Sequence, residues 1–183
     1  MFKQPGAVIR YYQIDYATPA TTSQPSGQTL IVRPVRVATM FDRDSLVYRD
    51  GAHRVGFYAY DQWIASPASQ VTELLLRDLR ASGEFAGVGL PGAFARPDLD
   101  LIVSVDDFTE VRTNGGASAS VSLQATLVKN EKDAGAARVI MQKTFSASEP
   151  CTPRDPESVV AALSEALKAA TAGLRAGMDE AVR

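Results

Sequence analysis

The sequence predicts a single α+β domain, with two helices on one face of a largely antiparallel or mixed β-sheet. Two observations lead to this fold class. Segments that alternate apolar and polar residues come in two groups, and each group is followed by one segment with the apolar spacing of a helix. The length of 183 residues suits one hydrophobic core. We therefore assign residues 1–183 to one domain and interpret residues 1–8 as a flexible N-terminal remnant.

The first group consists of short strands. They are expected at residues 9–16, 30–38, 45–49 and 54–60. Pro34 has no N–H to donate, so the second of these strands should lie at a sheet edge or carry a bulge. Asp50 and Gly51 tolerate the backbone angles of a tight turn and predict a hairpin between the last two strands.

Both helices begin with a capping residue followed by proline. Ser66-Pro67 opens the first helix, and Gly83 ends it. Asp155-Pro156 opens the second, whose apolar stripe is rich in alanine and continues to about residue 180.

The second group consists of three longer strands, expected near residues 99–108, 117–127 and 139–145. A change of phase at Asp106-Asp107 predicts a bulge in the first of them. Asn114-Gly115-Gly116 predicts the turn that follows. In the next strand, apolar residues alternate with polar ones, which predicts one buried face and one solvent-exposed face.

Charge and composition exclude several classes of function. Nineteen basic and 21 acidic side chains give a formal charge of −2, which offers no electrostatic footprint for nucleic acid or a polybasic membrane surface. No apolar run approaches the roughly 20 residues of a membrane-spanning helix. Cys151 is the only cysteine, which excludes an intramolecular disulfide and predicts a small buried thiol. The first residues contain no hydrophobic signal core, which leaves open a cytoplasmic protein or an export signal that has been removed.

No catalytic residue, metal site or cofactor is predicted. The only histidine, His53, falls in the predicted hairpin turn and is interpreted as an exposed turn residue. The densest acidic group is Asp98, Asp100, Asp106 and Asp107. Strand alternation divides this group between two faces, so we interpret it as a solvated strand surface. Three glycines, Gly87, Gly89 and Gly92, match a dinucleotide-binding spacing but lack the strand before it and the helix after it.

The most concentrated feature is aromatic. Phe57, Tyr58, Tyr60 and Trp63 fall within seven positions. Phe57 and Trp63 could fill the core beneath the first helix, or the cluster could form a partner surface, since tyrosine and tryptophan are enriched at interface hot spots.

The sequence from Leu30 to Val88 resembles the ABC-type transport auxiliary lipoprotein component family. This family includes the paraquat-inducible outer-membrane lipoprotein that works with an MCE protein. The resemblance rests on the opening strand Tyr11-Tyr12-Gln13-Ile14, a V-x-P-V-x-V strand, Phe41-Asp42-Arg43, a Leu-Val-Tyr-Arg strand, Trp63 shortly before Pro67, and Phe85.

This resemblance implies an exported protein, acylated on an N-terminal cysteine and held at the outer membrane facing the periplasm. It implies a non-catalytic role in lipid traffic, with an MCE-type protein or an ABC transporter component as partner and phospholipid as a candidate ligand. The sequence departs from the family in having no lipobox cysteine near its start, and Cys151 lies too far along the chain to serve as one.

Within this interpretation, two segments are predicted to bind the partner. They are Met40, Phe41, Asp42 and Arg43 between two strands, and Tyr58, Tyr60 and Trp63 in the aromatic cluster. A local turn ion pair is the alternative for Asp42 and Arg43. The alternative functions are a carrier that holds lipid in its own cavity, an envelope-biogenesis scaffold, and a hydrolase built around His53. Homo-oligomerisation through exposed strand edges stays open.

Overall fold

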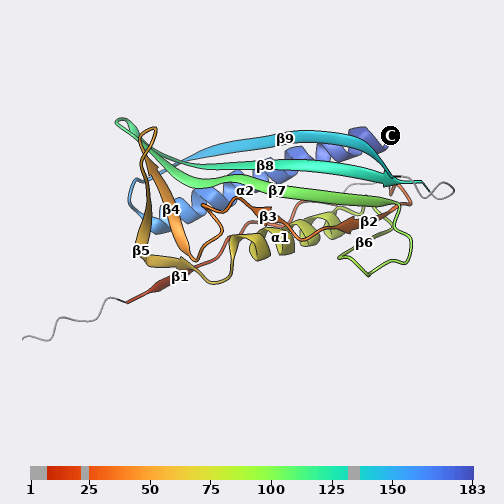
Figure 1. The fold of residues 1–183 in the computed structure, drawn as a ribbon, viewed down its shortest axis with the longest axis horizontal. Helices are drawn as coiled ribbons and strands as arrows, with labels where there is room; N and C mark the ends of the chain where they lie inside the picture. Colours follow the sequence, from red (N-terminus) through yellow and green to blue (C-terminus); the bar gives the residue numbers. More distant parts are fainter. Residues whose placement is uncertain (1–7, 22–24, 132–136) are drawn as a thin grey trace, which may run out of the picture.

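The computed structural model describes residues 8–21, 25–131 and 137–183, and it confirms the predicted α+β fold with a mixed sheet and two helices. Figure 1 shows the arrangement. The elements are β1 (Arg10–Tyr12), β2 (Thr29–Val32), β3 (Arg36–Val37), β4 (Ser45–Asp50), β5 (Val55–Trp63), α1 (Pro67–Ser82), β6 (Gly87–Gly89), β7 (Leu99–Thr113), β8 (Gly116–Asn130), β9 (Ala137–Cys151) and α2 (Pro156–Val182). Of the predicted N-terminal remnant, residues 1–7 lie outside the described residues, and Val8 is exposed.

Strand β7 organises the sheet. Along one edge it pairs antiparallel with β8, which in turn pairs with β9. Along its other edge it pairs in parallel with β2, β3 and β4 in succession. The predicted bulge is confirmed, because the register of β7 against β8 shifts between Val105 and Asp107.

The predicted strand at residues 30–38 is divided at Pro34. Because proline has no N–H, the ladder is interrupted there, and the chain forms β2 before it and β3 after it. Arg33 and Ala38 still donate backbone hydrogen bonds to β7 on either side of the break. The predicted edge position is correct for β3, which among the described strands pairs with β7 alone. β2 instead lies between β7 and β6.

The predicted hairpin joins β4 to β5, and Gly51 at its turn has a positive φ of 86°. Only three residues of the first predicted strand form a ladder, as β1 parallel to β5. The chain after β1 leaves the sheet toward the helices, and the N–H of Ile14 there donates to Gln70 Oε1 of α1.

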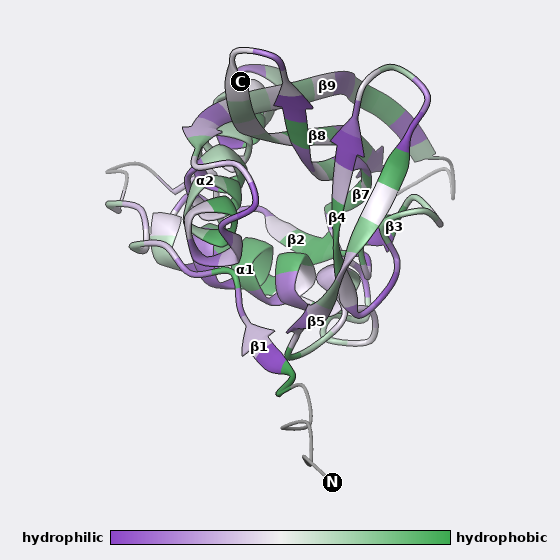
Figure 2. Cartoon of the chain, turned by 90° about the vertical axis from the view of Figure 1, so that its left-hand side faces the viewer, coloured by the Kyte–Doolittle hydropathy of each residue, from purple (hydrophilic) through white to green (hydrophobic). Residues whose placement is uncertain are grey.

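The predicted caps of α1 are confirmed, whereas Asp155 occupies the N-cap position of α2 without a capping hydrogen bond from its side chain. Ser66 accepts a hydrogen bond from the N–H of Ser69 at the start of α1, and Gly83 closes that helix in the left-handed conformation. Figure 2 shows that the sheet curves around both helices, so that α1 and α2 lie on its concave side. Alanines such as Ala166 and Ala170 on the buried face of α2 allow this helix to lie close to β8 and β9.

Candidate functional site

Exposed apolar side chains gather on one part of the molecule. Among the described residues, eleven large apolar side chains are exposed, and eight of them lie on β1, on β5 or in segments that flank or contact these strands. The eight are Val8, Ile9, Tyr11, Met40, Val55, Phe57, Tyr60 and Ile64. Since solvated apolar clusters mark interaction sites, we take this surface as the candidate site.

The pairing of β1 with β5 determines which side chains share a face. Tyr11 is level with Gln62, and Arg10 is level with Asp61. Arg10 and Tyr12 both turn to one side, where each donates a hydrogen bond to Asp61. Side chains at alternate positions turn to the opposite, outer side. We call the resulting group the edge patch; it consists of Ile9, Tyr11, Tyr60 and Ile64.

A second group at the surface, the turn face, consists of Met40, Asp42, Arg43 and Phe57, of which Arg43 is partly buried and the other three are exposed. The guanidinium of Arg43 lies 4.0 Å from the centroid of the Phe57 ring, in cation–π geometry. Arg43 Nε also donates to the carbonyl of Met40 at 3.0 Å. Among the described residues, Arg43 thus pairs with a ring and a carbonyl, and the turn ion pair with Asp42 considered from the sequence does not form.

Two of the predicted partner-binding residues belong to the core. Phe41 is 1% exposed and lies beneath the guanidinium of Arg49, and Trp63 is 5% exposed and packs against the ring of Phe108. The alternative interpretation of Trp63 as a core residue is therefore confirmed. Phe57, which was also considered for the core, is exposed instead. Neither Phe41 nor Trp63 can contact a partner without a change in packing.

Tyr58 points inward and joins a buried polar group that we call the Glu110 cluster. Glu110 is fully buried and accepts hydrogen bonds from Tyr58 Oη at 2.7 Å, Arg112 at 2.7 Å and the backbone N–H of Arg154 at 3.1 Å. The guanidinium of Arg112 stacks 3.6 Å from the ring centroid of Tyr48. Burial and the hydrogen bond to Glu110 raise the pKa of Tyr58 above its ordinary value. The cluster thus connects β5 to β7 and to the loop before α2.

Sequence reasoning did not identify Glu110, although a signal was present. After the predicted bulge, Phe108 occupies the apolar side of β7, and Glu110 follows two positions later on the same side. A carboxylate on the dry side of a strand requires a partner, and Arg112, two positions further, supplies it.

Cys151 lies beside this cluster and is partly buried. Burial, followed by the nearby Glu110 carboxylate, raises the pKa of the thiol above its ordinary value. Because the thiolate is the reactive species, we expect a thiol-specific disulfide reagent to modify Cys151 more slowly in the folded protein than in urea. The midpoint of the pH–rate profile should lie at higher pH in the folded state. Equal profiles in both states would contradict this placement of the thiol.

The remaining sequence candidates do not form a reaction site. His53 is exposed, as predicted. The interpretation of the acidic group as a solvated surface is wrong for Asp100, which is buried and accepts hydrogen bonds from Arg33 and Asn130 at 2.8 Å each. Asp107 pairs with Arg49 at 3.0 Å. Over the residues that the structure describes, no group of three or more acidic, histidine or cysteine side chains has the arrangement of a metal site.

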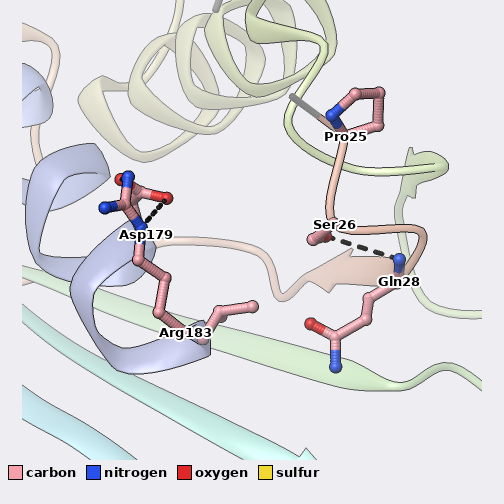
Figure 3. Close-up of a pocket in the computed structure, with 6 residues that line it drawn as sticks. Pro25, Ser26, Gln28, Asp179 and Arg183 are labelled. Atoms are coloured by element: carbon pink, nitrogen blue, oxygen red, sulfur yellow. Dashed lines mark hydrogen bonds and ion pairs between the residues drawn. The ribbon is translucent and has the colours of Figure 1, made fainter. Parts of the chain in front are cut away.

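A cavity of about 660 Å³ opens between the C-terminal end of α2 and the segment before β2 (Figure 3). It is lined by Pro25, Ser26, Gln28, Asp179, Val182 and Arg183. Asp179 and Arg183 form an ion pair on its wall. Acyl chains require apolar walls, so this polar lining does not favour a lipid-carrier role for the cavity.

Comparison with known proteins gives one family. The family model described as ABC-type transport auxiliary lipoprotein component matches residues 12–174. A crystal structure of a Xanthomonas campestris protein of the DUF330 family has 21% identity and a TM-score of 0.79, with 93% of this chain and 94% of that chain covered. A hypothetical protein from Chlamydia trachomatis has 10% identity and a TM-score of 0.56, with 82% and 97% covered. These two likenesses bear on the fold alone. None of the curated proteins shows a significant match. Neither helix of the described chain is long and apolar enough to cross a membrane.

Proposed function

Since the chain belongs to the family of ABC-type transport auxiliary lipoprotein components, we propose that it is a non-catalytic docking subunit of an MCE-type transport system that moves lipid across the envelope. In this proposal, an acylated N-terminus attaches the protein to the outer membrane, and the folded domain lies in the periplasm. The domain then recruits an MCE-type protein or an ABC transporter component.

The turn face is the observation that carries this proposal. Arginine, methionine and aromatic side chains are enriched in protein interfaces, and here they stand together on the surface. The contact of Arg43 with the Phe57 ring holds both side chains in place before a partner arrives, which lowers the entropy lost on binding. Met40 and Asp42 extend the same surface, while buried Phe41 supports it from below. Tyr60, another residue predicted to bind the partner, belongs to the edge patch.

Site-specific photo-crosslinking in cells tests the docking role. The protein would be produced with a lipoprotein export signal and a photoreactive phenylalanine analogue at position 40 or 57. We expect crosslinks to an MCE-type protein or an ABC transporter component from both positions. Val139 on β9, 55% exposed, provides the matched control and should give no such product. Arg43→Glu should weaken the crosslink from position 57. Failure to recover a transport protein from either position, or equal recovery from position 139, would reject the proposal.

A further inference from the structure

The edge patch differs from the turn face in its chemistry. It combines two isoleucines with two tyrosines, and all four side chains are between 43% and 61% exposed. On the opposite side of the two strands, Arg10 and Asp61 neutralise each other in an ion pair of 2.7 Å. The patch therefore offers apolar surface and phenolic hydroxyls without a side chain of net charge, and Gln62 is the neutral neighbour of Tyr11.

This chemistry matches the boundary between lipid headgroups and acyl chains. Tyrosine is enriched at that depth because its ring is apolar and its hydroxyl remains hydrogen-bonded to water or headgroups. Isoleucine side chains gain free energy by leaving water for the acyl region. A polybasic patch would instead have indicated attraction to anionic headgroups, and the edge patch contains no cation.

The position of the patch in the chain indicates which partner covers it. Ile9 follows Val8, the first described residue, which is itself 79% exposed. Among the described strands, β1 pairs with β5 alone, and it lies at one end of the molecule, far from the end of α2 (Figure 1). An anchor on the N-terminal side of the chain would attach the domain at this end, next to the edge patch.

We infer that the edge patch seats in the interfacial layer of a lipid bilayer and holds the domain with β1 toward the membrane. This inference rests on the proposed lipid anchor, but it does not depend on docking through the turn face. The bilayer contact orients the domain, whereas an anchor alone would leave it free to rotate about its tether.

Lipid-quenching measurements test this orientation. The full chain carries a hexahistidine tag ahead of Met1, which tethers it to vesicles of phosphatidylethanolamine, phosphatidylglycerol and a nickel-chelating lipid. In a Cys151→Ala background, a fluorophore is attached to a single new cysteine at position 64 or position 139. A lipid with a nitroxide just below the headgroup should quench the label at position 64 several-fold more than the label at position 139. Equal quenching at the two positions would overturn the inference.

A second measurement needs no label. Tyr60→Glu combined with Ile64→Glu should lower the vesicle-bound fraction of the tagged chain at limiting nickel lipid. We expect the binding constant to fall by about tenfold or more, because the variant loses two apolar side chains that would enter the bilayer. Val139→Glu should leave binding unchanged. If the double variant binds as well as the unaltered chain, the patch does not enter the bilayer.

The two proposals can fail separately. Lipid quenching at position 64 together with no crosslink from positions 40 and 57 would reject docking through the turn face and keep the membrane contact. A crosslink from position 64 to a transport protein, without lipid quenching, would assign the edge patch to protein docking and overturn the membrane contact.

Discussion

Glu110→Ala is expected to destabilise the protein by about 3–5 kcal/mol, the range found when one partner of a buried ion pair is removed. The change leaves the Arg112 guanidinium without its carboxylate in a site where only 11% of the arginine side chain is exposed. It also removes the acceptor of Tyr58 Oη and of the Arg154 N–H. Urea unfolding followed by circular dichroism gives the free energy of unfolding directly.

Two comparisons make this test specific. Glu165 forms an exposed ion pair with Lys168, so Glu165→Ala should cost no more than about 1 kcal/mol. The double variant Glu110→Leu/Arg112→Met removes both charges and should recover much of the loss, because no buried charge remains unpaired. If Glu110→Ala unfolds within 1 kcal/mol of the unaltered protein, the described burial of the cluster is wrong. Glu110→Gln extends the test should the alanine variant fail to fold.

Phe41→Ala should cost about 3–5 kcal/mol of stability, whereas Met40→Ala should change it by no more than about 0.5 kcal/mol. Phe41 is buried in the core cluster, so its truncation leaves a cavity, while the neighbouring Met40 is 38% exposed. Thermal unfolding of the two variants, measured side by side, provides the comparison.

The same pair of variants separates folding from docking. Met40→Ala should weaken the crosslink from position 57 without lowering the melting temperature. Phe41→Ala should reduce crosslinking only in proportion to the folded protein that is lost. A stable Phe41→Ala variant with normal melting would show that the aromatic ring is not part of the core.

The regular elements could be predicted because their signals are local. Ser66 and Gly83 mark the ends of α1, and Gly51 marks the hairpin turn, through backbone preferences of a few neighbouring residues. The bulge near Asp107 followed from a change of phase within one strand. The division of residues 30–38 into β2 and β3 was harder to predict. The missing N–H of Pro34 is compatible with one strand at an edge or with a bulge, and also with two separate strands that both pair with β7.

The candidate site was only partly predictable, since exposure within irregular segments depends on what packs over them. Met40 and Phe41 are adjacent and both apolar, yet they have opposite environments because the turn folds one of them under Arg49. Tyr58 and Tyr60 are two positions apart on β5, and simple alternation would place them on one face, yet Tyr58 points inward to Glu110 and Tyr60 is exposed. The register of β5 against β4 shifts between Ser45 and Val47, which simple alternation does not capture. Ile9 and Ile64 lie in the edge patch because β1 pairs with β5, and this pairing was not predicted from the sequence.

The hydrogen bond from the backbone N–H of Asp15 to Ser164 Oγ connects positions that are 149 residues apart. The short strands beside β7 likewise pair across long stretches of chain. Closing such loops costs chain entropy before any contact offsets it, so this domain should fold slowly compared with a helical bundle of equal size. A chain that ends before α2 would leave the concave side of the sheet uncovered at β8 and β9, and this apolar surface would be prone to aggregation. A chain that is being synthesised or translocated can therefore reach its native state only after the 27 residues of α2 have emerged.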